Sequence, residues 1–109
     1  MKLIAAIIQQ EDANEATAEL LQNGYKITKL RGIGGFLEEG NLVLLIGVED
    51  AHVPKVLQIF QKTCVARDRY INALPFVPME GMPPLSFPVK VTVGGAKIFV
   101  LPVEEFHML

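Results

Sequence analysis

Apolar runs broken by polar residues divide the first part of the chain into a strand followed by a helix. Residues 3–9 (LIAAIIQ) form a short apolar run that ends at polar positions, which is typical of a central strand. A helix is expected next, with Asp12 as its N-cap and Glu15 in the position of a capping box. Gly24 is expected to end this helix, because glycine adopts the left-handed C-terminal conformation at little cost.

Two more strands and a second helix are expected over the middle of the chain. Residues 25–31 alternate imperfectly between polar and apolar positions, whereas residues 42–48 are apolar on both faces and predict an interior strand. The glycine-rich segment 31–41 is expected to join these strands as a hairpin. Asp50 then precedes a helix in which apolar residues recur at helical spacing as far as Cys64.

The last third of the chain is expected to contain a long loop and a hairpin. Residues 66–88 hold five of the seven prolines, and this segment is expected to form a loop without regular structure. Residues 89–93 and 96–103 are β-branched runs on either side of Gly94 and Gly95, a pattern that is typical of a β-hairpin.

The order of these elements predicts an α+β fold. We expect a ferredoxin-like (βαββαβ) sandwich with an added C-terminal β-hairpin, in a single domain over residues 1–109 with flexible loops near 31–41 and 66–88. Apolar residues occur on both faces of the strands, so we expect symmetric homo-oligomerisation to cover the face that the helices leave open. The half-apolar tail 104–109 is expected to dock on the body or on a neighbouring subunit.

Composition narrows the classes of function. The chain has 109 residues and a formal net charge of -2, so no basic excess favours binding to nucleic acid. Its apolar runs are too short for a transmembrane helix, so we expect no membrane insertion and a cytoplasmic location. The single cysteine, Cys64, permits neither an intramolecular disulfide nor a site of several thiolates.

Candidate catalytic and metal-binding groups are few. The segment 32–36 (GIGGF) matches neither a Walker A motif nor a dinucleotide fingerprint, so a flexible hairpin loop is the simpler interpretation. Asp50 and His52 suit a helix cap, and no nucleophile lies near them to complete a general acid–base site, which makes a small enzyme the weakest hypothesis. A metal site of His52, Cys64 and His107 would require the fold to bring them together. We expect no catalytic residues, no metal and no cofactor.

Polar side chains on two neighbouring strands offer a better candidate for a binding site. Lys26 and Thr28 share one face of the second expected strand, and Asn41 shares a face of the third with Gly47. These residues are expected to converge beside the bare backbone of Gly47, because a glycine within a strand often marks close approach by another group. A hairpin bulge with incidental polar neighbours is the alternative.

Four segments carry a resemblance to a known family, namely MKLIAAIIQ, GYKITKLRGIGGFLEEGN, LLIGVED and VGGAKIFVLPVEEF. In register over most of the chain outside 66–88, the sequence resembles the PII-like cyclic di-AMP receptor proteins of bacteria. The most specific part is GGFL-x-x-GN followed by LLIGVED.

The resemblance implies a non-enzymatic sensor that passes a signal to a downstream protein, which the sequence does not identify. It implies a homotrimer of ferredoxin-like subunits that holds cyclic di-AMP, or a related adenine nucleotide, in clefts between adjacent subunits. It also implies two loops whose order changes on binding. The positions that match the ligand contacts of the family are Lys26, Thr28, Gly35, Phe36, Leu37, Asn41 and Gly47.

Several departures from the family pattern fall within the implied site. Glu38 and Glu39 replace a basic residue near a ligand that carries two negative charges, Leu42 and Val43 remove hydroxyl groups, and Met108 replaces a polar residue. These departures motivate an alternative hypothesis, a PII-like trimeric protein-interaction module that has lost nucleotide binding.

Overall fold

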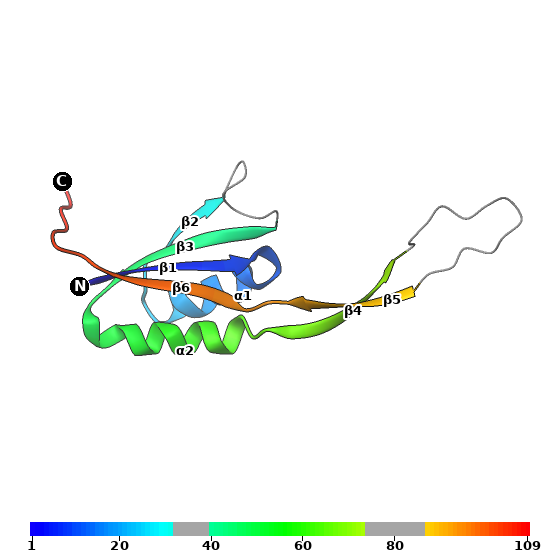
Figure 1. Ribbon diagram of the computed structural model, residues 1–109. Coiled ribbons are helices and arrows are strands. Elements are labelled where there is room, and N and C mark those ends of the chain that lie inside the picture. Colours follow the sequence, from blue (N-terminus) through cyan, green and yellow to red (C-terminus); the bar gives the residue numbers. More distant parts are fainter. Residues whose placement is uncertain (32–39, 74–86) are drawn as a thin grey trace, which may run out of the picture.

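A four-stranded antiparallel sheet forms the body of the protein. The computed structural model describes residues 1–31, 40–73 and 87–109. The strand order is β2-β3-β1-β6 (Figure 1). The bounds of these strands are Lys2–Gln9 for β1, Thr28–Arg31 for β2, Asn41–Val48 for β3 and Ala96–Pro102 for β6. At the centre of the sheet, Ala5 lies opposite Leu45 on one side and Phe99 on the other.

Two helices cover one face of this sheet. Helix α1 spans Gln10–Gln22, and a 3-10 turn η1 at Asp50–His52 leads into α2 at Val53–Thr63. Every second residue of β1 and β3 is buried beneath them, and the helices contribute Leu20, Val56 and Phe60 to the same core. This arrangement confirms the predicted ferredoxin-like α+β fold, with β6 as its fourth strand.

The opposite face of the sheet is apolar and no described element covers it. The residues of β1 and β3 on this face are only partly buried, and Phe99 of β6 is 57% exposed. The apolar residues that share the open face, as the strand registers place them, are Leu3, Ala5, Ile7, Leu30, Val43, Leu45, Phe99 and Leu101.

Helix α1 begins earlier than its capping pattern predicts. Its N-cap is Gln9, which makes no side-chain capping bond, so the prediction of Asp12 as N-cap is wrong. Asp12 lies in the first turn, where it is 5% exposed and pairs with Arg67 instead of with backbone amides. The expected end of the helix is confirmed, because Gly24 follows it with φ of +83°.

The expected loop over 66–88 is wrong at both of its ends. Strand β4, Arg67–Ala73, pairs in antiparallel register with β5, Phe87–Val93, and the two form a separate sheet that extends away from the body (Figure 1). We call this two-stranded sheet the arm. The five prolines favour a loop in the sequence pattern. Among the described residues, however, both strands of the arm are edge strands, and an edge strand tolerates proline, here Pro88 opposite Asn72.

The expected C-terminal hairpin is also wrong. Although Gly94 and Gly95 have φ of +80° and +82°, the strands on either side of them belong to different sheets. Strand β5 pairs with β4, and β6 pairs with β1. The glycine pair is therefore the passage from the arm to the body. A β-branched run on each side of a Gly-Gly pair signals two strands, but it does not determine their partners.

Two further expectations differ from the structure. Strand β2 starts at Thr28, three residues later than the alternating pattern predicts. The C-terminal tail does not dock on the described part of its own chain, because Phe106 is 64% exposed and Met108 is 83% exposed, and its docking on a neighbouring subunit stays a prediction.

Candidate functional site

The predicted site residues on β3 lie at its two ends. Asn41 is the first residue of the strand and faces Gln9, whereas Gly47 lies near the other end and faces Leu3. Six residues of extended chain span about 20 Å. The prediction that Asn41 and Gly47 converge is therefore wrong within one chain. The prediction that they share one face of the sheet is confirmed.

The Gly47 end of the strand holds a pocket of about 350 Å³. Lys26 and Gly47 line it together with Tyr25 and His52, which are joined by a hydrogen bond of 2.9 Å between Tyr25 Oη and His52 Nδ1. Thr28 lies on the same side of β3, opposite Leu45. The structure thus brings Lys26 and Gly47 to one end of the sheet and places Thr28 nearer its centre.

Gly47 leaves space at this end that a side chain would fill. It is exposed, and a Cβ placed on it would meet only the end of the Met1 side chain, at 3.5 Å. Within residues 1–31, 40–73 and 87–109, nothing in the packing therefore demands glycine here. This observation favours close approach by a ligand or a second chain over a purely structural role.

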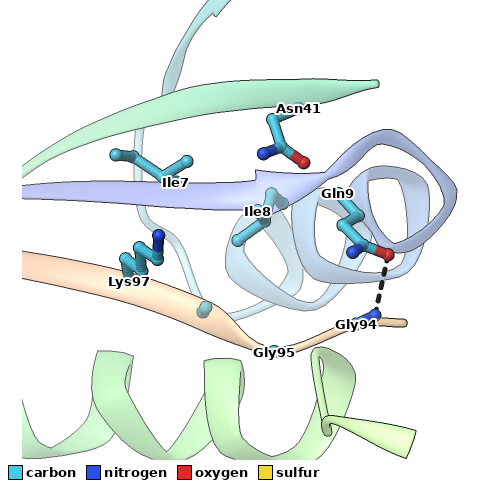
Figure 2. Close-up of a pocket in the computed structure, with 8 residues that line it drawn as sticks. Ile7, Ile8, Gln9, Asn41, Gly94, Gly95 and Lys97 are labelled. Atoms are coloured by element: carbon cyan, nitrogen blue, oxygen red, sulfur yellow. Dashed lines mark hydrogen bonds between the residues drawn. The ribbon is translucent and has the colours of Figure 1, made fainter. Parts of the chain in front are cut away.

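The Asn41 end of the strand holds a different pocket, of about 340 Å³ (Figure 2). It is lined by Asn41 of β3, Gln9 of β1, Lys97 of β6 and Gly94, among other residues. The side chain of Gln9 is held in place, because its Oε1 accepts a hydrogen bond of 2.7 Å from the backbone amide of Gly94.

A second, wider hollow of about 670 Å³ adjoins this pocket. The two share Gln9 and Asn41, and the second is lined in addition by Glu11 of α1 and Arg69 of the arm. Amide side chains can pair with the edge of a purine, and ammonium and guanidinium groups bond phosphate oxygens strongly. The Asn41 end therefore combines groups that suit both parts of a nucleotide.

Gln9, Lys97 and Arg69 line hollows together with Asn41, and the sequence patterns do not predict this proximity. Gln9 could have been found from its position, since it is the polar residue that ends the first strand. No local signal identifies the other two, because their proximity depends on which strands β4 and β6 pair with.

Three of the predicted ligand contacts, Gly35, Phe36 and Leu37, lie outside the described residues, as do Glu38 and Glu39. The departure at Leu42 does not concern the open face, because this side chain is 2% exposed and packs into the core beneath the helices. Val43 does lie on the open face, opposite Ile7 and Leu30.

The residues of the weakest hypotheses have other partners in the structure. His52 is bonded to Tyr25, and His107 pairs with Glu105 at 3.1 Å in the tail. Cys64 is 3% exposed, and burial raises the pKa of its thiol. Within the described ranges, no three His, Cys, Asp or Glu side chains are placed to hold a metal ion together.

Taken with the fold, these pockets define a small ferredoxin-like α+β domain with polar ligand-sized hollows at both ends of its sheet. A family model described as "Cyclic-di-AMP receptor" matches residues 1–109, and the chain belongs to this family. It is also similar to a crystal structure of a functionally unknown protein from Pediococcus pentosaceus ATCC 25745. That similarity has 38% identity and a TM-score of 0.73, and it covers 99% of this chain and 96% of that one.

In the part of the chain that the structure describes, neither helix has the length and hydropathy that a membrane span requires.

Proposed function

We propose that this protein is a non-enzymatic signal-transduction protein that binds cyclic di-AMP, or a related adenine nucleotide, between the subunits of a PII-like homotrimer. The observation that carries the proposal is the family match, which extends over the whole chain. A downstream protein would read the signal through rearrangement of the segment 31–41 and of the arm.

The open face of the sheet supports the homotrimer. Leu3, Leu45, Phe99 and Leu101 form part of a continuous apolar surface on this face. Surfaces of this composition are usually covered by another protein surface. A second copy of the chain offers a surface of the same kind, and closed symmetry leaves no copy uncovered.

The separation of the site residues supports a ligand held between subunits. Asn41 lies at one end of β3, and Lys26 and Gly47 lie at the other. A neighbouring subunit packed on the open face would bring further groups to each end of the sheet. In the bound state, Asn41 would read the edge of an adenine, Thr28 would donate a hydroxyl hydrogen bond, and Lys26 would neutralise a phosphate.

The alternative is a PII-like trimeric protein-interaction module without nucleotide binding. The acidic pair Glu38 and Glu39 and the apolar Val43 on the open face favour it. Leu42 gives it no support, because a buried side chain contacts no ligand.

Isothermal titration with cyclic di-AMP, with ATP and cyclic di-GMP as comparisons, tests the proposal together with molar mass from light scattering. We expect a trimer that binds one cyclic di-AMP per subunit. Thr28→Ala and Asn41→Ala should remain trimeric and lose affinity, and unchanged affinity in both would contradict the site assignment. A trimer that binds none of the three nucleotides would favour the interaction module.

A further inference from the structure

The orientation of the arm depends on a small junction with the body. Among the described residues, β4 and β5 pair only with each other. At the root of the arm, Arg67 bonds Asp12 of α1 at 3.1 Å and the carbonyl oxygen of Val65 at 3.0 Å. Gly95 donates a hydrogen bond of 2.6 Å to the carbonyl oxygen of Cys64. These bonds attach the arm where it leaves the body.

Both arginines of β4 reach Glu11 of α1, and Arg67 makes the longer contact, at 3.7 Å between its Nη2 and Glu11 Oε2. Arg69 lies two residues further along β4 and makes the shorter contact. Its Nη2 lies 2.8 Å from Glu11 Oε2, and both side chains are accessible to solvent, at 50% for Arg69 and 34% for Glu11. The pair lines the wider hollow that also contains Asn41 and Gln9. The arm therefore contributes a cation to the hollow beside a predicted ligand contact.

An anion in this hollow would compete with Glu11 for Arg69. Guanidinium groups bind phosphate and carboxylate in the same geometry, so one partner can replace the other. An exposed ion pair contributes little free energy, and its loss is therefore a small cost of ligand binding. Arg67 cannot exchange its partner for an anion in this way. Its partner Asp12 is buried, and its hydrogen bond to the Val65 carbonyl fixes the guanidinium.

Gln9 gives the hollow a second point of contact. Because its Oε1 accepts from Gly94, its amide nitrogen is turned away from the arm root (Figure 2). That nitrogen can donate to an acceptor atom of a ligand without breaking the bond to Gly94. A ligand beside Asn41 would then contact the arm in two ways, directly at Arg69 and through Gln9 at Gly94.

We propose that Arg69 is a phosphate-binding residue of the ligand site, and that a bound cyclic dinucleotide draws it from Glu11 and so fixes the orientation of the arm. This inference rests on the proposed function and assigns a regulatory consequence to the same site. Arg67 and Asp12 stay paired in both states and act as the hinge. The group that Arg69 would bind is a phosphate, which ATP also carries, so ATP serves as the comparison ligand.

Arg69→Gln and Glu11→Gln both break the ion pair between Arg69 and Glu11. Comparing them separates a ligand-binding role of Arg69 from a purely structural role of the pair. Arg69→Gln should weaken binding of cyclic di-AMP by at least about tenfold, because it removes a charge-assisted hydrogen bond. Glu11→Gln should tighten binding by about two- to fivefold, because it removes the competitor while leaving Arg69 in place. Lys90→Gln, which breaks the arm's own 3.3 Å pair with Asp68, is the matched control and should change neither affinity nor arm protection.

Amide hydrogen exchange of residues 67–73 and 87–93 provides an independent readout. Saturating cyclic di-AMP should slow exchange in the wild-type arm, and this protection should be lost in Arg69→Gln even at saturation. Protection of the arm by ATP and not by cyclic di-AMP would contradict the assignment of the ligand as a cyclic dinucleotide.

The outcomes distinguish failure of the proposed function from failure of the role proposed for Arg69. If the wild-type protein binds none of these nucleotides, the proposed function and this inference are both overturned. If the wild type binds and both variants lose affinity equally, the ion pair has only a structural role and the inference alone is overturned. Unchanged affinity in Arg69→Gln overturns it as well.

Discussion

The body and the arm of this protein are stabilised by different interactions. In the body, alternate residues of β1 and β3 are fully buried beneath two helices, and Phe60 is 1% exposed at the centre of the core. In the arm, Tyr70 is 68% exposed and Ile71 is 45% exposed. A two-stranded ribbon is marginally stable in water by itself, so the arm depends on its backbone ladder and on the few bonds at its root. Apolar burial therefore determines the body, and polar contacts position the arm.

Removal of a large core side chain should have the largest effect and should be confined to the body. Phe60→Ala is expected to lower the free energy of unfolding by about 3–5 kcal/mol, because it leaves a cavity between α2 and the sheet. Ile71→Ala on the arm should change it by no more than about 0.5 kcal/mol. Urea unfolding followed by circular dichroism measures both, and equal losses would show that the arm is part of the cooperative core.

A single negative charge on the open face should separate the subunits of the proposed homotrimer. Phe99→Glu places a carboxylate in an apolar surface that another copy would cover, so light scattering should give the mass of one chain instead of three. Val89→Glu makes the same change on the arm and should leave the mass unchanged. A variant at position 99 that stays trimeric would place the subunit contact elsewhere.

Adding a methyl group at Gly94, where the arm joins the body, should destabilise the protein. Gly94→Ala is expected to cost more than about 1 kcal/mol, because the residue has positive φ and the new Cβ would overlap the Val65 carbonyl oxygen and Arg67 Nη1. Gly24→Ala is the matched control, with φ of +83° and no neighbouring atom within 4 Å of the new Cβ. Urea unfolding should show the smaller loss for Gly24→Ala, and hydrogen exchange should accelerate in the arm only for Gly94→Ala.

The smallest expected effect is the titration of Cys64. Burial raises the pKa of its thiol in the folded state above the unfolded value of about 8.5. Above that pH the unfolded chain loses the proton while the folded chain keeps it, so the free energy of unfolding should fall as pH rises. Cys64→Ala should remove this part of the slope. Rapid alkylation of the native wild-type thiol at pH 8 would contradict the burial that causes the shift.

The packed layers of the body could be predicted from the sequence because their signals are local. The apolar run 3–9 and the run 42–48 each predict a strand, and the helical spacing after Asp50 predicts α2. The residue types and their period along the chain predict these elements, although both runs are apolar on both faces and the side that the helices cover is decided by the tertiary fold. The family resemblance added an expected class of ligand, and the family match bears out that resemblance.

The arm and the two ends of the candidate site could not be predicted in this way. A β-branched run such as 87–93 pairs equally well with a strand before it or after it, and only long-range packing assigns it to β4. Likewise, Asn41 and Gly47 share a face of β3 by their parity, but the length of the strand keeps them apart. Residue periodicity specifies which way a side chain points, whereas the distance between side chains depends on strand pairing. The neighbours of Asn41, which come from β1, β6 and the arm, are therefore a property of the folded protein.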